Sequence, residues 1–489
     1  MNKISIIIIL LMSTTIGYAQ NEEDALRYSE IYFDGTARST AMAGAMGALG
    51  GDFSAVMQNP ASLARIRKSN FSATFNLENP RTTANYYGAN TNDRGVAGNF
   101  SNLSYVKAYE LDPKKFNNWY SVQLGMGMTR VKSFQQRSRY KGTADSSIVH
   151  SFINEANGTP DSLIYDFFPF TAGLAYDVFA MDPAPGNQYV TDFTSGQAIH
   201  DRTITNKGGM NTYSFSLSGN YGNKVYVGGA INFTKVNYNS QFQHIESYTD
   251  TALWLQRINY TGELDIEGWG YNARFGFVYL PVEWLSVGLS GQLPTLFNLS
   301  DSWTNNMTSM TDDGEKFVDP EYVPTGSFDY RITTPARANL SIGAIMWELG
   351  SIGLDIEYVD YGKSILASKR YSDAPYSFDL ENSQVANLYK STLNYKLGVE
   401  GRLSKQSYIR GGIAYYSSPY VDGKGNAASP TIFYTGGLGY NWGKVYADFA
   451  TVLLSKKTNY YAYDPTMNGS RAAFDISNYS FKFSVGFRF

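Results

Sequence analysis

The sequence predicts an all-β protein, a transmembrane antiparallel β-barrel of about 14 strands with a small N-terminal helical plug inside the lumen. Three observations predict this fold: segments in which apolar and polar residues alternate, connections that are alternately short and long, and an N-terminal stretch of small residues without alternation. Successive side chains of a strand face opposite sides, so alternation gives one face for lipid and one for a wet lumen.

The alternation is clearest in residues 479–489. Every odd position there is apolar, and every even position is small, polar or charged. The last strand of a soluble sandwich is the alternative, although a bare aromatic face would aggregate in water. Because it ends on Phe489, the stretch resembles the closing strand of outer-membrane barrels. We therefore expect loss of this side chain to impair assembly more than transport.

Similar segments recur from residue 69 onward, and we assign the barrel to residues 67–489. Their number is even, as in single-chain bacterial barrels. The segments lie near residues 69–79, 98–110, 118–134, 209–221, 224–247, 254–280, 283–298, 326–347, 351–361, 391–403, 406–418, 430–441, 444–456 and 477–489.

The connections between these segments alternate in length. Short ones lie at 222–223, 280–282, 349–350, 404–405 and 442–443. Long ones cover roughly 80–97, 135–208, 299–325, 362–390, 419–429 and 457–476, and only the connection near 248–253 is short on the long side. This pattern predicts tight periplasmic turns and long outer loops, with 135–208 the largest loop.

The N-terminus and the composition indicate an exported protein. Residues 1–19 read as a signal peptide, with Lys3, an apolar run over 4–12, and Gly17 and Ala19 before the expected cleavage site. The sequence has no cysteine and a mean hydropathy of −0.30, and no later stretch reaches the 18 apolar residues of a membrane helix. The net charge of −3 gives no case for nucleic-acid binding.

Residues 20–66 lack strand alternation and are rich in Ala and Gly between 37 and 51. Such small residues pack tightly, so we interpret the segment as a plug, or hatch, inside the barrel. Asn59, Pro60 and Ala61 form its predicted turn, because proline restricts the residue before it.

The same segment carries a resemblance to a known family. The runs 35–38 (GTAR), 42–45 (MAGA), 47–52 (GALGGD) and 59–61 (NPA), followed by Leu63, resemble the N-terminal signature of the FadL/TodX outer-membrane transporters of long-chain fatty acids and other hydrophobic compounds. Pro335, Leu340, Gly343 and Asp355 are similar to later strands of that family. Within it, the chain most resembles a branch often labelled haemin receptors.

The resemblance implies a route: capture by outer loops, passage to a pocket at the plug, and lateral exit into the bilayer near a kinked third strand. It places the gate at Asn59, Pro60 and Ala61. Gly125 and Gly127 in the third segment are the candidates for the exit, with ordinary barrel curvature as the alternative. The candidates for ligand capture lie in the apolar part of the largest loop, for which a self-packed cap is the alternative: Phe167, Phe168, Phe170, Leu174 and Phe179.

No pattern indicates an enzyme. The only histidines are His150, His200 and His244, and no G-x-S-x-G motif is present. We expect no catalytic residue, no cofactor and no histidine–carboxylate cluster for a metal. Inward charges such as Lys396 and Arg410 either bind a carboxylate headgroup or neutralise one another.

The function we expect is passive uptake of hydrophobic molecules, such as long-chain fatty acids, across the outer membrane of a Gram-negative cell. The expected partners are the hydrophobic ligand and membrane lipid. Two alternatives stay open: a binding or assembly partner of a secretion machine, and a haem-binding receptor.

Overall fold

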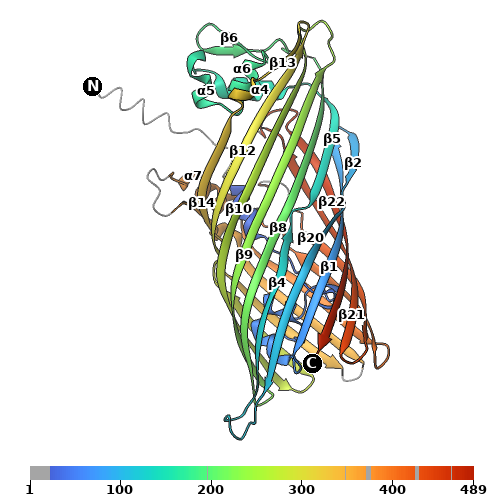
Figure 1. The fold of residues 1–489 in the computed structure, drawn as a ribbon. Helices are drawn as coiled ribbons and strands as arrows, with labels where there is room; N and C mark the ends of the chain where they lie inside the picture. The colour runs from blue at the N-terminus through green and yellow to red at the C-terminus, as the bar shows by residue number, and fades with distance from the viewer. Residues whose placement is uncertain (1–21, 195, 347–348, 370–375, 425–428, 464) are drawn as a thin grey trace, which may run out of the picture.

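A computed structural model describes residues 22–489 except 195, 347–348, 370–375, 425–428 and 464 (Figure 1). The expected signal peptide, residues 1–19, lies outside the described residues. No helix among the described residues is long and apolar enough to cross a membrane.

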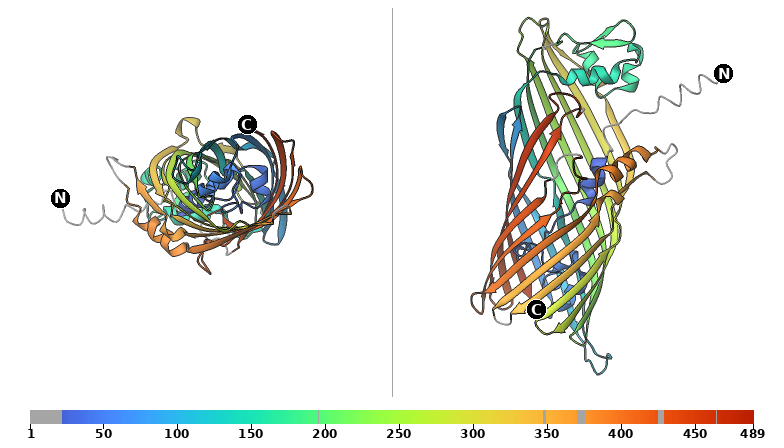
Figure 2. Two further views of the ribbon diagram at one scale, coloured as in Figure 1. Left: turned by 90° about the horizontal axis from the view of Figure 1, so that it is seen from below. Right: turned by 180° about the vertical axis from the view of Figure 1, so that it is seen from behind.

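The described strands form a closed antiparallel barrel of 14 staves, where a stave is one complete crossing of the wall (Figures 1 and 2). Five staves consist of two strands separated by a short break: β2 with β3, β4 with β5, β11 with β12, β14 with β15, and β16 with β17. The last stave closes the barrel by pairing Arg488 with Asn70. The strands are β1 (Asn70–Tyr86), β2 (Ala89–Arg94), β3 (Ala97–Glu110), β4 (Trp119–Ser133), β5 (Gln136–Ala144), β8 (Ala198–Tyr221), β9 (Val225–Tyr248), β10 (Leu255–Val282), β11 (Leu285–Gln292), β12 (Leu296–Thr311), β13 (Gly314–Phe317), β14 (Thr325–Thr333), β15 (Arg337–Met346), β16 (Gly350–Asp360), β17 (Ile365–Ser368), β18 (Ser391–Arg402), β19 (Ser407–Tyr416), β20 (Thr431–Asn441), β21 (Val445–Tyr461) and β22 (Arg471–Arg488).

The predicted fold class is confirmed, but several strands are longer than the alternation indicates. The fourth stave begins at Ala198 rather than near 209, and β5 also lies within the predicted loop 135–208. The expected boundaries of that loop are therefore wrong, and the part outside the barrel strands is 145–197. The reason is physical: above the membrane the outward side chains are polar, such as Thr203 and Gln241, so apolar alternation no longer marks the strand.

A belt of exposed apolar side chains surrounds the lower part of the wall. Large aromatic and aliphatic residues on neighbouring staves are 40–60% exposed, which a wall in water would not tolerate over so large an area. This belt is the lipid-facing surface of an outer-membrane barrel. Members on adjacent staves are Phe75, Phe100, Met126, Phe215, Ile231, Phe275 and Leu289.

Residues 145–197, which we call the cap, lie above one side of the barrel (Figure 1). The cap contains α4 (Ile148–Ala156), η3 (Asp161–Leu163), α5 (Ile164–Phe167), α6 (Ala172–Asp177), β6 (Asp182–Ala184) and β7 (Gln188–Val190). Its apolar side chains form a core of their own that also packs against the inner rim of the barrel, including Tyr248, Leu255 and Ile258. A further helix, α7 (Asp379–Leu388), lies outside the cap.

The N-terminal plug lies inside the barrel (Figure 2). It comprises α2 (Glu22–Ser29), α3 (Ala37–Ala41), η1 (Phe53–Met57) and η2 (Pro60–Arg65). Its small residues meet glycines of the wall: a Cβ atom at Gly398 would lie 2.4 Å from Met42 O, and one at Gly437 would lie 2.6 Å from Ala41 Cβ. Small residues on both sides let the plug backbone approach the wall closely, as the sequence predicts.

Candidate functional site

The Asn59-Pro60-Ala61 turn is held by staves four to seven. Asn59 Oδ1 accepts a hydrogen bond from Ala61 N (3.0 Å), which caps η2, while its Nδ2 donates to Phe277 O (3.1 Å). Ser218 Oγ donates to Pro60 O (2.7 Å). Asn59 therefore uses its acceptor within the plug and its donor toward β10, and neither toward the third stave.

A glycine in β10 provides the space for this turn. A Cβ atom at Gly276 would lie 1.9 Å from Asn59 Oδ1 and 2.9 Å from Pro60 Cδ. We expect Gly276→Ala to lower the free energy of unfolding by about 1–3 kcal/mol through overpacking. The control is Gly229→Ala, where the new Cβ meets only ordinary contacts from 3.7 Å. Urea unfolding of the two variants in detergent measures the difference, and equal stabilities would contradict this account.

Several charged residues of the wall, Arg410 and Lys482 among them, are paired with one another or with the plug. Arg410 contacts both Glu400 and Asp448 at 2.6 Å, and Arg38 of the plug donates to Glu400 (3.0 Å). Lys482 pairs with Asp34 of the plug. Mutual neutralisation, one of the two alternatives that the sequence left open, is thus what these side chains do.

The predicted exit at Gly125 and Gly127 does not coincide with a gap. Both glycines are paired on either side, Gly125 with Val106 and Ser216, and Gly127 with Ser104 and Ser214. A Cβ atom at either position would press on plug residue Phe53. The expectation of an opening at these positions is therefore corrected: the glycines admit the plug, and the wall there is continuous.

The wall is interrupted further up, between the second and third staves. Pairing between β3 and β4 ends at Asn102 and Thr129, where Asn102 Nδ2 donates to Met128 O (3.1 Å). Above this point residues 97–101 of β3 and 130–133 of β4 do not pair with each other. Phe100, in this stretch, is 60% exposed, so the interruption borders the apolar belt. We call it the wall opening.

At its upper end the wall opening is closed by contact between β1 and β5. Thr82 Oγ1 donates to Arg137 O (3.1 Å), and the Arg137 guanidinium lies 3.3 Å from the Asp93 carboxylate. At this level β4 and β5 are separated by Phe134 and Gln135. The third stave is therefore interrupted at Phe134 and Gln135, seven to ten residues after the two glycines.

Residues 22–33, the N-terminal segment, cover the wall opening from inside. Tyr32 N donates to Val131 O (3.2 Å), a carbonyl group of the bulged end of β4. Lys132 Nζ donates to Arg27 O (2.9 Å) and pairs with Glu30 (3.3 Å). An opening in the wall requires protein partners for its backbone groups, and here the N-terminal segment supplies one for Val131 O.

An apolar cluster lies around α2, next to polar side chains of the wall such as Asn272 and Gln292. α2 contributes Ala25, Leu26 and Tyr28 to a buried cluster whose other members come mainly from the inner face of the wall. Between this segment and the wall lies a cavity of about 20 Å³, enough for about one water molecule. Val131 lines this cavity and also borders the wall opening. The wall members of the cluster include Phe134, Met210, Val236, Tyr238, Ile266, Phe297, Leu299, Tyr330 and Ile332.

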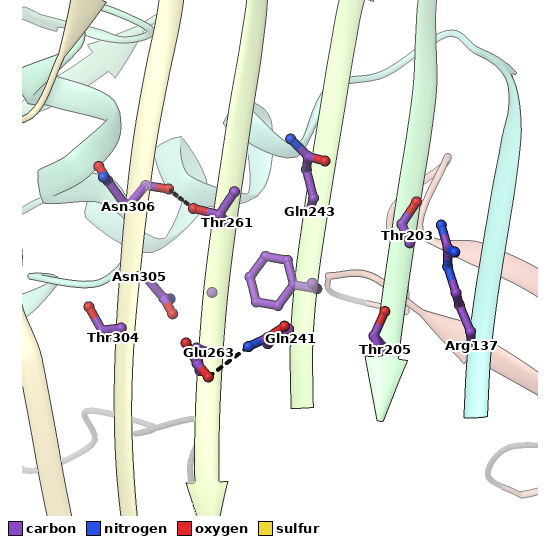
Figure 3. A pocket seen from close by; sticks show the side chains of 12 residues that line it. Arg137, Thr203, Thr205, Gln241, Gln243, Thr261, Glu263, Thr304, Asn305 and Asn306 are labelled. Carbon is purple, nitrogen blue, oxygen red and sulfur yellow. Dashed lines mark hydrogen bonds between the residues drawn. The ribbon is translucent and has the colours of Figure 1, made fainter. Parts of the chain in front are cut away.

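A larger hollow of about 480 Å³ lies on the outward face of the wall above the belt (Figure 3). Its lining is mostly hydroxyl, amide and charged side chains, including Thr203, Gln243, Glu263 and Asn306. Such a lining offers hydrogen bonds and little apolar contact. This hollow therefore does not suit a hydrophobic ligand.

The five aromatic and aliphatic capture candidates of the cap differ in exposure. Leu174 is 2% exposed in the cap core, while Phe179 is 49% exposed and packs edge-on against Trp254. Phe167 and Phe168 are half-buried and in contact with each other. Phe170 is also half-buried, and its ring lies 5.7 Å from that of Trp303. Much of this apolar stretch thus packs within the cap, and only some of its rings stay accessible.

The structure brings together two histidines and a carboxylate, which we did not expect from the sequence. His200, His244 and Glu246 are buried, and their ligand atoms all lie within 4.8 Å of one another. Strand register explains this: His200 pairs with Glu246, and His244 lies two residues before Glu246 on the same face of β9. The His-x-Glu spacing was a signal in the sequence, but its partner across the sheet was hidden inside the supposed loop.

No family model matches the sequence, and neither does any curated protein. Solved structures do match. A Pseudomonas aeruginosa FadL homologue superposes with a TM-score of 0.56 at 12% identity, over 94% of this chain and 99% of that one. The P. putida toluene transporter TodX gives a TM-score of 0.53 at 14% identity, again over 94% and 99%. The resemblance seen in the sequence is confirmed at the level of architecture: the chain has the fold of the FadL and TodX proteins, a closed 14-stave barrel around an N-terminal plug.

Proposed function

We propose that this protein takes up hydrophobic small molecules, such as long-chain fatty acids, passively across the outer membrane and releases them sideways into the bilayer. The observation that carries this proposal is the apolar cluster of α2 and the inner wall, which includes Val131 at the wall opening. General porins have a polar, water-filled lumen. Keeping a hydrophobic cargo in such a lumen costs roughly 25 cal/mol for each Å² of apolar surface.

In this proposal the exposed rings of the cap, such as Phe179, make the first contact with cargo. Cargo then takes the place of α2 in this apolar cluster, because a cavity of about 20 Å³ is too small to hold it. The N-terminal segment acts as the gate, and the Asn59-Pro60-Ala61 turn anchors the rest of the plug while it moves. The exit in this proposal is the wall opening and not the position of Gly125 and Gly127.

Flux measurements with the purified protein in liposomes test this function. We expect a fluorescent long-chain fatty acid to enter the bilayer faster than in protein-free liposomes, while a small sugar does not cross. Sugar flux without fatty-acid transfer would contradict the proposal. An inventory by mass spectrometry of lipids that co-purify with the protein identifies the natural cargo, and haem as the main bound molecule would favour the receptor alternative.

The ion pairs of Glu30 give a prediction for pH. Burial disfavours the charged carboxylate, but Lys456 and Lys132 outweigh burial and lower the pKa of Glu30 from its ordinary 4.5 to about 2. A lowered pKa means that the pair stabilises the folded protein fully above pH 4.5 and ceases to do so as pH falls toward 2. The difference in unfolding free energy between wild type and Glu30→Gln should therefore be constant from about pH 5 to 6 and shrink below 4.5. Nearer pH 8 Lys132 also titrates, because burial lowers its pKa to about 8. A difference that grows on acidification would contradict this assignment.

A further inference from the structure

The buried His200–His244–Glu246 cluster lies where the cap joins the barrel. Glu246 Oε2 accepts a hydrogen bond from Ser147 Oγ (2.5 Å), and its Oε1 accepts one from Ile148 N (2.8 Å). Ser147 is the N-cap of α4, the first helix of the cap. Anything that binds this cluster therefore acts directly on the attachment of the cap.

One arrangement of hydrogen atoms satisfies both neighbours of Tyr86 Oη. Tyr86 Oη then donates its single hydrogen to Gly469 O (2.8 Å) and accepts from His200 Nδ1, also at 2.8 Å. In this arrangement the Nδ1 atom of His200 carries a hydrogen. In a neutral imidazole the other nitrogen, Nε2, then has none.

That bare nitrogen faces oxygen atoms that only accept. His200 Nε2 lies 2.8 Å from Ser146 O and 3.3 Å from Glu246 Oε1. His244 Nε2 lies 2.9 Å from the same carboxylate oxygen, and its Nδ1 has no hydrogen-bond partner among the described residues. In this arrangement the lone pairs of two imidazoles, a carboxylate and a carbonyl group converge on one buried point, which favours a positive charge there.

We propose that this point binds one divalent transition-metal ion of the Zn²⁺ class, held by His200 Nε2, His244 Nε2 and Glu246, with Ser146 O as fourth ligand. Two histidines and a glutamate are a common zinc donor set. With bonds of about 2.0–2.1 Å, tetrahedral ligand atoms lie about 3.3 Å apart, close to the spacings found here. Binding requires His244 to carry its hydrogen on Nδ1, the atom without a partner.

The surroundings match those of a metal site. Ligating histidines usually have their second nitrogen held by another group, and Tyr86 does this for His200. Arg202 is the next inward residue on β8, and its guanidinium lies 4.2 Å from the Phe242 ring centroid. The guanidinium is thus directed to that ring, and Glu246 contacts the two histidines. The ion would tie β8, β9 and the start of the cap together.

Metal binding to the full-length protein in detergent tests the proposal. Because the cluster is fully buried, the metal-free protein is unfolded with chelator and refolded with Co²⁺ or Zn²⁺. We expect one ion per chain, visible d–d absorption bands with Co²⁺, and a higher unfolding temperature with either ion. His200→Gln, His244→Gln and Glu246→Gln should each lose the bands while still migrating as a folded, heat-modifiable barrel.

Two further variants separate a metal site from a merely structural cluster. Tyr86→Phe keeps the ligands but removes the group that holds His200, so Zn²⁺ affinity should fall roughly 10–100-fold. His150→Gln changes the remaining histidine, whose ring contacts Ser147 N and Phe193 O, and should bind metal like wild type. A folded wild type that binds no metal, which a doubly protonated His200 would produce, overturns the proposal. So does binding that survives in a folded His200→Gln/His244→Gln double variant.

Discussion

Glu400→Leu should lower the free energy of unfolding by about 3–5 kcal/mol, because it removes the shared partner of the buried Arg410 and the partly buried Arg38. Glu400 lies between Arg38 of the plug and Arg410 of the wall, and it is 8% exposed. After the substitution Arg38 loses its ion pair, and Arg410 keeps only Asp448. We also expect the plug to become sensitive to protease while the barrel stays folded, because Arg38 is a plug residue.

Urea unfolding with a matched surface variant measures this effect. Asp475→Asn removes one partner of the exposed Lys457–Asp475 pair, and we expect a change within about 0.5 kcal/mol. Glu400→Gln keeps hydrogen bonding without the charge. Its loss of unfolding free energy should lie between those of Glu400→Leu and Asp475→Asn. Equal losses of unfolding free energy at the buried and the exposed pair would show that the Arg38–Glu400–Arg410 ion pairs do not hold the plug.

Closing the wall opening should reduce transfer of fatty acid into the bilayer to the level of protein-free liposomes. Ser101→Cys in β3 and Val131→Cys in β4 place one thiol on each edge of the opening, in a chain without other cysteines. A disulfide or a short bifunctional thiol reagent then bridges the edges. Since the route passes between them, the bridge blocks exit while the barrel and the cap are unchanged. Reduction of the disulfide should restore transfer.

The control bridges two staves whose wall is already closed. Ser72 and Ser104 face each other across β1 and β3, with their hydroxyl oxygens 2.8 Å apart. A disulfide between Ser72→Cys and Ser104→Cys should leave transfer unchanged. If both bridges block transfer equally, or if neither does, cargo does not leave between β3 and β4.

The sequence was sufficient for the barrel but not for the details of the route. Lipid-facing alternation depends on local residues such as Phe481, Phe483 and Val485, so strand segments and the stave number could be predicted. The wall opening depends on which residues of β3 and β4 lack partners, and that is a property of register between strands. Gly125 and Gly127 drew attention as flexible residues, whereas their actual role is to make room for Phe53.

The same reasoning explains what was missed above the membrane. There, outward residues such as Thr203 are polar, so the sequence predicts a loop where β5 and the start of β8 lie. The sequence therefore does not indicate that His200 lies beside His244 and Glu246 of β9. Contacts of the plug were predictable only in kind: the small residues indicated close packing, but the pairing of Tyr32 with Val131 required the fold.

The most direct test of the central claim, that hydrophobic cargo passes the N-terminal segment and leaves through the wall opening, is to map where bound cargo lies. A long-chain fatty acid with a photoreactive group near its methyl end is added to the protein in liposomes, and the labelled residues are identified by mass spectrometry. The account predicts labels on Val131 and Met210 and on Ile31 of the N-terminal segment, which line the cavity between that segment and the wall. Labels confined to the opposite end of the plug, around Arg65 and Ile66, would show passage through the lumen into the periplasm and would contradict it.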